Sequence, residues 1–380
     1  MVTIKDISKK CGYSSATVSK ALNGGADINQ KTVEHILNVA KGMGYFPNAV
    51  ARALKTNRTY NLGVLFVDKT FSGLAHEYFS SVLNSFKVEA ERLGYDITFI
   101  SRNINRVGMS YLDHCHYRGC DGVVIASIDF SDPDVVELVQ SNIPIVTIDH
   151  VFNECTSILS DNVQSVKDLV THVYNKGHRK IAFIHGEDTS VTRKRLGSFH
   201  RTCSNLGIDV QSEYLRAAIY HDPKSSGLAT RELLALKNRP SCILYPDDFS
   251  ILGGITEIER AGLSIPEDIS IVGYDGIHLS QVLRPRLTTL RQDTEILGRE
   301  AAAQLVDAIE NPKSYIPQQI VVPGTVIAGE TVKQLILAGN THIFPIYASI
   351  FKEDINEKSI SYCVGSAFAG HFRRIRAGRD

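Results

Sequence analysis

The hydrophobic pattern of the chain changes after about sixty residues. In the first sixty, apolar side chains recur three or four positions apart in short segments separated by Gly, Ser and Asn, which is helical spacing. From Asn61 onward, short runs rich in Val, Ile and Phe alternate with longer amphipathic segments. Such alternation is typical of parallel sheets with helices between the strands. The pattern predicts a small all-α head followed by a larger α/β body.

Two short helices with a tight turn between them are predicted at the start of the head. Ile4, Ile7 and Cys11 fall on one stripe of the first helix, and polar residues fill the other faces. Gly12 follows at a position where a left-handed cap is easily adopted. Ser14 then offers a hydroxyl as the N-cap of the second helix. The turn is therefore about three residues long, which predicts a helix-turn-helix.

The second helix has an apolar stripe and an outer edge of small or polar side chains. Val18, Ala21 and Leu22 form the stripe, and they reach the first helix only if the two helices cross steeply. An edge of short side chains and one cation can enter a DNA major groove without obstruction. The edge residues are Ser15, Ala16, Ser19 and Lys20, with Thr17 beside them. A helical hairpin without a DNA role is the alternative interpretation.

A third helix and a short linker complete the predicted head. Asn29 is the expected N-cap of the third helix, which ends at Gly44 and Pro47. We therefore assign residues 1–46 to a helix-turn-helix domain. Residues 47–60 contain a helix-spaced segment with too few apolar residues to be stable alone, so we expect it to order only against a partner.

Charge is distributed unevenly between head and body. The first sixty residues hold nine Lys or Arg against three acids, although the formal net charge of the whole chain is zero. A compact basic module attached to a slightly acidic body is typical of proteins that bind a polyanion. A merely solvated basic surface is the alternative, and charge alone does not exclude it.

The body, residues 61–332, is predicted to form two lobes around a cleft. Strand-like and helical segments form one alternating series over residues 61–160 and a second alternating series over residues 161–289. The later segments LTTLRQD and IVVPGTVIA, with a helix between them, are expected to return to the first lobe. We therefore assign residues 61–160 and 290–332 to lobe 1, and residues 161–289 to lobe 2.

Acidic side chains at strand ends are the first candidates for ligand contacts. In open α/β sheets ligands bind beyond the carboxyl ends of the strands. Carboxylates there accept hydrogen bonds from sugar hydroxyls, whereas an anionic ligand needs basic groups. A loop or N-cap role is the alternative for each acid. The candidates are Asp68, Asp149, Asp247 and Asp275, with Tyr78 or Phe79 as an aromatic platform.

Other chemistry has little support in the sequence. No apolar run approaches eighteen residues and seven cysteines are scattered, so we expect a cytoplasmic chain with reduced thiols and no membrane partner. His114, His116 and Cys120 resemble a metal cluster, but helical phases spread them around one axis, so we expect no metal and no cofactor. Phosphate-loop and nucleophile-elbow motifs are absent, and we predict a protein that is not an enzyme. A two-lobed α/β enzyme with an accessory helical domain is the alternative.

The segments TIKDISKKCGYSSATVSKALN and GYFPNAVARAL resemble the lactose-repressor family of bacterial transcription regulators. The resemblance continues to about residue 332 and implies a helix-turn-helix head joined to a periplasmic-binding-protein-like domain. It implies a regulator, expected to be a repressor, that binds a palindromic operator as a homodimer. The implied DNA contacts are Ser15, Ala16 and Lys20 to bases, Thr17 and Asn23 near phosphates, and a hinge helix from Asn48 to Lys55 with Leu54 as a minor-groove wedge.

The resemblance also implies a small-molecule effector, a sugar or a similar polar compound. The positions that match the effector contacts of the family are Asp149, Arg193, Asp247 and Asp275. One departure concerns Pro246-Asp247-Asp248, where many members have Asn before the Asp. This departure is expected to add a charge to the pocket and makes the sugar class doubtful. Some members bind a phosphocarrier protein as corepressor. Residues 333–380 extend beyond the family pattern and receive no predicted function.

Overall fold

The computed structural model describes residues 2–24, 27–46, 58–67, 72–104 and 107–335. Four of the predicted features lie outside these residues: Asn48, Leu54, Asp68 and most of the C-terminal extension. The head and the body are described separately below.

Three helices form the head. They are α1 (Ile4–Cys11), α2 (Ser15–Leu22) and α3 (Gln30–Gly42). Gly12 adopts a left-handed conformation with φ of 77° and caps α1, while the side chain of Ser14 accepts a hydrogen bond from the Thr17 backbone at the start of α2. Asn29 caps α3 in the same way. These predicted helices and caps are confirmed.

A single small core joins the three helices of the head. Ile7 and Val18 are fully buried, and Ala21 is nearly so. They pack with Ile36 and Ala40 of α3. Leu22 contacts the same core but is only partly buried. The predicted inner stripe of α2 is therefore confirmed, and it fixes which side of the helix faces outward.

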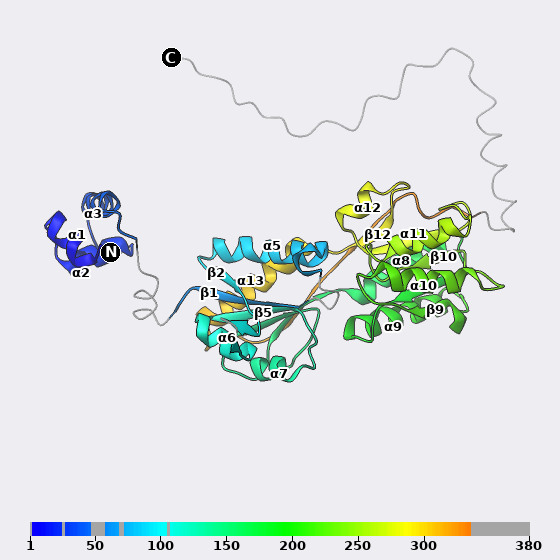
Figure 1. Cartoon of the computed structure of the whole chain (residues 1–380), viewed down its shortest axis with the longest axis horizontal. Helices are drawn as coiled ribbons and strands as arrows, with labels where there is room; N and C mark the ends of the chain where they lie inside the picture. The colour runs from blue at the N-terminus through cyan, green and yellow to red at the C-terminus, as the bar shows by residue number, and fades with distance from the viewer. Residues whose placement is uncertain (1, 25–26, 47–57, 68–71, 105–106, 336–380) are drawn as a thin grey trace, which may run out of the picture. The chain divides into compact units, whose positions relative to one another are not determined.

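The first lobe is a parallel six-stranded sheet covered by helices on both faces (Figure 1). Helices α5 (Glu77–Arg92) and α13 (Thr294–Glu310) pack on one face, and α6 (Tyr111–Arg118) and α7 (Pro133–Val139) pack on the other. A short turn of 3-10 helix, η1 (Gly73–Ala75), precedes α5. In sheet order the strands are β13 (Gln319–Val322), β7 (Thr156–Ser160), β6 (Ile145–Ile148), β5 (Gly122–Ser127), β1 (Asn61–Phe66) and β2 (Asp96–Phe99). Strands β3 (Asn103–Ile104) and β4 (Val107–Gly108) pair antiparallel in a separate two-stranded sheet.

Helices α5 and α13 approach each other closely at Gly298. A Cβ atom at this position would lie 2.2 Å from the carbonyl oxygen of Val82 and 2.6 Å from the backbone nitrogen of Phe86. Both groups belong to the backbone of α5, which cannot move aside without moving the helix. The absence of a side chain at Gly298 therefore sets the spacing of these two helices.

The second lobe repeats the architecture of the first. Helices α8 (Asn162–Asn175) and α9 (Ser190–Asn205) cover one face, and α10 (Pro223–Leu234) and α11 (Ile251–Arg260) cover the other. Two short elements, η2 (Ser212–Tyr214) and α12 (His278–Val282), belong to the same lobe. In sheet order the strands are β14 (Thr325–Ile327), β12 (Thr288–Arg291), β11 (Ser270–Asp275), β10 (Cys242–Leu244), β8 (Ile181–His185) and β9 (Leu215–Ala217).

The predicted return of residues 290–332 to the first lobe is correct only in part. Helix α13 and strand β13 belong to the first lobe. Strand β12, however, pairs in parallel with β11, and β14 pairs antiparallel with β12, so both strands belong to the second lobe. The apolar pattern marks these segments as strands but carries no information about their partners, which hydrogen bonding and burial decide.

The chain therefore passes between the two sheets at three points. The passages lie between β7 and α8, between β12 and α13, and between β13 and β14. In the described part of the chain, every helix is too short or too polar to cross a membrane.

Candidate functional site

Helix α2 presents small and charged side chains outward because its apolar side is buried in the head. Ser15, Ala16 and Lys20 are exposed, and Thr17 is partly exposed. The structure thus places the residues predicted to read bases on the free side of α2. Whether they contact DNA stays a prediction.

Several of these side chains bond within the head. Lys20 forms an ion pair with Asp27, which holds the pKa of that carboxyl below its ordinary value. The amide of Asn23 donates to the carbonyl of Ser19 at 2.6 Å, and the Thr17 hydroxyl lies 2.9 Å from that of Ser14. The ion pair with Asp27 therefore competes with any bond from Lys20 to a phosphate or a base.

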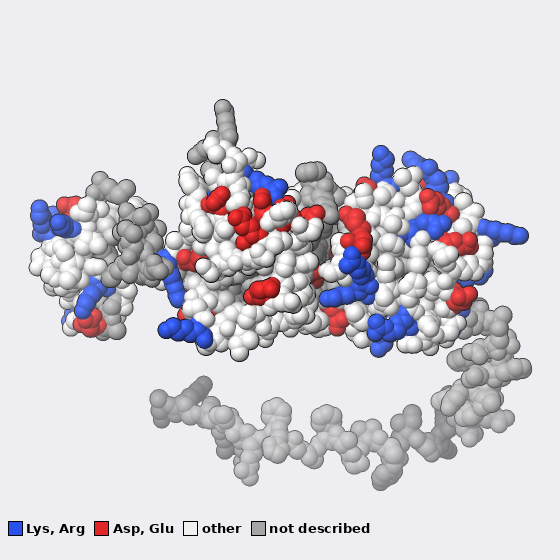
Figure 2. Space-filling view, turned by 90° about the horizontal axis from the view of Figure 1, so that it is seen from below, with Lys and Arg blue, Asp and Glu red and all other residues white. Residues whose placement is uncertain are grey.

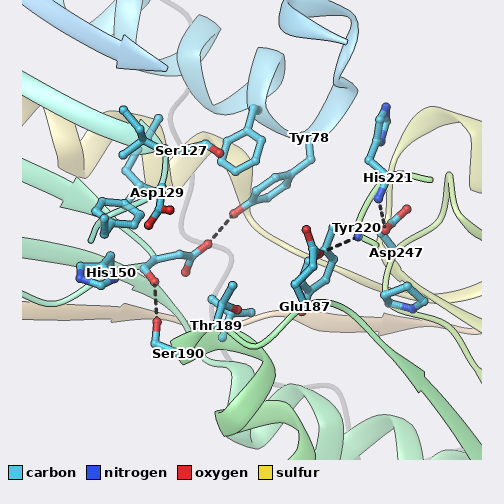
Figure 3. A pocket seen from close by; sticks show the side chains of 18 of the residues that line it. Tyr78, Ser127, Asp129, His150, Glu187, Thr189, Ser190, Tyr220, His221 and Asp247 are labelled. Carbon is cyan, nitrogen blue, oxygen red and sulfur yellow. Dashed lines mark hydrogen bonds between the residues drawn. The ribbon is translucent and has the colours of Figure 1, made fainter. Parts of the chain in front are cut away.

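The body contains a cavity of about 510 Å³ whose walls come from both lobes (Figure 3). Tyr78, Phe79 and Asp149 of the first lobe line it, together with Asp247 and Asp275 of the second. A volume of this size suits a small molecule. The cavity lies at the carboxyl ends of β6 and β11, as expected for parallel sheets.

Asp149 and Asp275 occupy equivalent positions in the two lobes. Asp149 follows β6 with φ of 57°, and Asp275 ends β11 with φ of 105°. Such φ values are unusual for a residue with a side chain, and strain of this kind concentrates at ligand sites. Asp149 accepts hydrogen bonds from the Ser160 backbone at 2.7 Å and from the Tyr78 hydroxyl at 3.1 Å. Both backbones are thus held in conformations that direct a carboxyl group to the cavity.

The Asp275 carboxyl is buried and accepts a hydrogen bond from Gln292. Burial and the neighbouring Asp247 raise the pKa of its carboxyl to about 8, which Arg195 only partly opposes. Gln292 donates its side-chain amide to the Asp275 carboxyl at 2.7 Å. The carbonyl oxygen of the same Gln292 side chain is buried and has no hydrogen-bond partner among the described residues. Gln292 is one of the residues that line the cavity.

Asp247 supports the local fold of the second lobe. Its carboxylate accepts hydrogen bonds from the His221 backbone at 2.8 Å, from the Ser250 backbone at 2.7 Å and from the Ser250 hydroxyl at 2.7 Å. The side chain is only 4% exposed. Asp247 lines the cavity as predicted, but these bonds occupy both of its oxygens.

Asp248 does not add a charge to the cavity, contrary to the sequence expectation. Its carboxyl is fully buried and accepts hydrogen bonds from the Thr289 hydroxyl at 2.6 Å and the Ile277 backbone at 3.0 Å. It is not among the lining residues. Burial and the nearby Asp275 raise its pKa well above the ordinary value. The sequence could not show that the second Asp of this motif points into the interior of the lobe.

The two lobes touch beside the cavity. The imidazole rings of His76 from the first lobe and His221 from the second are stacked, with centroids 4.0 Å apart. Phe249 stacks on the other face of His221 at 4.1 Å. The Glu77 carboxylate also accepts a hydrogen bond from the His278 backbone. Any change in the angle between the lobes must alter these contacts.

Comparison with known proteins identifies the family. The model of bacterial regulatory proteins of the lacI family matches residues 3–48, and a periplasmic binding protein-like domain matches residues 170–332. The transcriptional repressor PurR of Mannheimia succiniciproducens is 31% identical over 316 residues, which cover 81% of this chain and 92% of PurR. The chain belongs to the lacI family. It is a DNA-binding transcriptional repressor.

Other members of the lacI family match over most of the chain. The probable repressor ExuR of Bacillus subtilis is 29% identical, covering 83% of this chain and 93% of ExuR. The structure of the Lac repressor dimer bound to operator and the anti-inducer ONPF has a TM-score of 0.72 and 25% identity, covering 87% of this chain and 99% of that one. A complex of the regulator CelR with cellobiose shares the fold, with a TM-score of 0.63 and 22% identity, covering 87% of this chain and all of that one.

The lacI-family resemblance selected Arg193, but Arg195 is the buried arginine of the cavity. Arg193 lies at the edge, where it is exposed and pairs with the equally exposed Asp188 at 2.6 Å. Arg195 is 6% exposed, and its guanidinium carbon lies 3.5 Å from the centroid of the Tyr274 ring. Its guanidinium donates to the side chain of Asn162 at 2.7 Å and to the carbonyl of Pro246 at 2.9 Å.

Two candidate effector contacts in the body, Arg195 and Gln292, were not predicted from the sequence. Arg195 shares the buried stripe of α9 with Thr192, Phe199 and Thr202, and this helical spacing was a usable signal. Gln292 had no such signal, because its role depends on β12 pairing with β11. Phe79 was predicted as an aromatic platform and does line the cavity, with its ring 4.9 Å from that of His76.

Proposed function

We propose that this repressor binds a palindromic operator as a homodimer and is controlled by a small polar effector, a sugar or a similar compound, in the cavity between its lobes. The observation that carries the proposal is the cavity itself, since its lining joins buried polar groups of both lobes in a chain that also has a DNA-binding head. A solved relative was found as a dimer with operator and an anti-inducer, which supports the same assembly here.

The proposed DNA contacts centre on α2. Ser15, Ala16 and Lys20 would contact base edges in the major groove, because they form the exposed side of the helix. Thr17 and Asn23, at the two ends of the same surface, would contact phosphates. Asn48 and Leu54 belong to the proposal as hinge contacts, but they lie outside the described residues.

The proposed effector contacts are Asp149, Arg193, Asp247, Asp275 and Phe79. We add Arg195 and Gln292 to this proposal because both line the cavity. A ligand that bonds both walls stabilises one arrangement of the lobes over others. A tenfold change in operator affinity requires about 1.4 kcal/mol of difference in effector binding between the two arrangements. The contacts of His76 with His221 and of Glu77 with His278 would change with the lobe angle.

Selection of operator sequences followed by footprinting tests the DNA part. We expect sequence-specific protection with two-fold symmetry that weakens as salt is added. Lys20→Ala should weaken specific binding, whereas Lys224→Ala, which removes an exposed Lys at the start of α10, should not. Equal losses in both variants would contradict a reading role for α2.

The effector part is tested in the same footprint. A small molecule that occupies the cavity should change protection in the parent chain and lose this effect in Asp275→Asn. A phosphocarrier protein added to the reaction tests for a corepressor. Turnover of a small molecule without specific DNA protection would instead support the two-lobed enzyme, an alternative that the repressor relatives disfavour.

A further inference from the structure

Carboxylates outnumber cations in the lining of the cavity. Among the described residues, the acids that line it are Asp129, Asp149, Glu187, Asp188, Asp247 and Asp275. The guanidinium groups of the lining are those of Arg193 and Arg195. In Figure 2 acidic side chains also gather over the visible face of the first lobe. Even with Asp275 protonated, the other five acids outnumber the two guanidinium groups, so the field inside the cavity is negative and repels an anionic ligand.

Both arginines of the lining already have partners. Arg193 forms a two-point ion pair with Asp188, with distances of 2.6 and 2.9 Å. Arg195 bonds Asn162 and the Pro246 carbonyl, and it stacks on Tyr274. A carboxylate or phosphate ligand would have to displace these bonds while lying among the acids. In the described lining, neither guanidinium is therefore left uncommitted, as an anionic ligand would need.

The carbonyl oxygen of the Gln292 side chain has no hydrogen-bond donor among the described residues. Gln292 directs its amide N–H to Asp275, which fixes the orientation of the amide and leaves its carbonyl oxygen as an acceptor. That oxygen is buried without a partner among the described residues, and the Gln292 residue as a whole is only 6% exposed. Buried acceptors are nearly always satisfied in folded proteins, so a further hydrogen-bond donor is expected at this oxygen. The Asp275 carboxyl, directly beside it, is a second acceptor when ionised.

The acids around this point repel one another. Burial opposes ionisation of Asp275 most strongly, and Asp247 and Asp149 add to its effect. Arg195 offsets this only in part, since the pKa of Asp275 is still raised to about 8. A cation placed at Asp275 would remove the repulsion and let the carboxyl ionise. The surroundings of Asp275 are thus electrostatically suited to a positive group.

We infer that the effector is a small polyhydroxylated molecule that carries a protonated amine and no anionic group, with the amine bound between Asp275 and the Gln292 carbonyl. The inference depends on the proposed function, because it assumes that this cavity is the effector site. The hydroxyl groups of the ligand face Asp149 and Glu187, and Phe79 provides an apolar wall. Amino sugars and aminated polyols are the compounds of this class.

Matched ligands test the charge requirement. Calorimetry on the full chain at pH 7 compares sugars that differ at one position: glucose, glucosamine and glucuronate, and the corresponding galactose, mannose and ribose series. In at least one series we expect the amine to bind roughly tenfold more tightly than the hydroxyl compound. The carboxylates should not bind. Equal or tighter binding of neutral or anionic members, or no binding by any amine, would overturn the inference.

Proton release gives a second readout. At pH 7 the buried Asp275 carboxyl is largely protonated, because its pKa is about 8. Binding of an amine should therefore release up to about one proton, which calorimetry in two buffers of different ionisation enthalpy measures. Asp275→Asn should abolish the release and lower amine affinity, while Asp96→Asn, at the exposed start of β2, should change neither. Binding of an amine without proton release would contradict its placement at Asp275.

Two outcomes separate the amine character of the ligand from the effector role of the cavity. Operator protection that responds to a neutral or anionic ligand through Asp275 would keep the function and reject the amine. Tight amine binding that never alters operator binding would keep the ligand class and reject its role as effector.

Discussion

The guanidinium carbon of Arg195 lies over the ring of Tyr274, 3.5 Å from the ring centroid, and the guanidinium bonds two acceptors of the second lobe. Because the group is buried, its loss leaves the Pro246 carbonyl without this donor and leaves the Asn162 side-chain oxygen with only the Tyr274 hydroxyl, at 3.3 Å. We expect Arg195→Met to lower the free energy of unfolding by about 2–4 kcal/mol. Arg193→Met removes only an exposed ion pair and should leave stability nearly unchanged. Urea denaturation measures both, and similar losses would contradict the assignment of Arg195 as the internal arginine.

Asp275 should make stability depend on pH. Its pKa is raised from 3.8 to about 8, so between these values the folded chain binds a proton that the unfolded chain has released. The free energy of unfolding therefore falls, through this group, as the pH rises from about 4 to 8. Asp275→Asn removes that dependence. The stability of the variant relative to the parent should increase across this range and level off above it. A difference that stays constant with pH would show that Asp275 titrates normally.

Alanine substitutions at two helical glycines should have opposite effects on stability, because Gly298 lies at the contact between α5 and α13 and Gly197 is exposed. Gly298→Ala places a methyl group 2.2 Å from the Val82 carbonyl oxygen and should lower the free energy of unfolding by about 1–3 kcal/mol or more. Gly197→Ala, on the exposed side of α9, meets no atom within 4 Å and should raise it by up to about 1 kcal/mol. Thermal and urea unfolding of the two variants test this. A neutral Gly298→Ala would mean that the helices are not packed as described.

The ion pair between Lys20 and Asp27 predicts a gain in DNA affinity when it is broken. Asp27→Asn frees Lys20 for DNA and removes a negative charge from the head, so operator affinity should increase by roughly threefold to tenfold at low salt. Glu34→Gln removes the same charge from an exposed position on α3 without a described ion pair to Lys20. It should give a smaller increase. Equal increases in both variants would mean that only net charge matters.

The local parts of the fold were predictable because they depend on neighbouring residues. The caps at Gly12, Ser14 and Asn29 depend on backbone conformation and nearby hydroxyl or amide groups, so the helices of the head followed from the sequence. The burial of Val18 and Ala21 was likewise predictable, from the helical spacing of the apolar residues. The acids at the ends of β6 and β11 were found because parallel sheets place ligands there.

The non-local parts were not predictable from these patterns. Strands β12 and β14 have ordinary strand sequences, and only their hydrogen bonds assign them to the second lobe. The same limit applies to Asp248, whose burial depends on Thr289, forty-one residues later in the chain. Gln292 reaches Asp275 for the same reason, since it directly follows β12.

The three passages of the chain between the sheets have a consequence for dissection of this protein. No continuous stretch of sequence contains all of one lobe without part of the other, because α13 and β13 interrupt the second lobe and complete the first. A fragment cut at residue 161 would expose the surface of α5 that α13 covers. Gene truncations and domain exchanges that treat the body as two consecutive halves should therefore yield insoluble protein, whereas exchange of whole bodies behind the same head keeps every sheet complete.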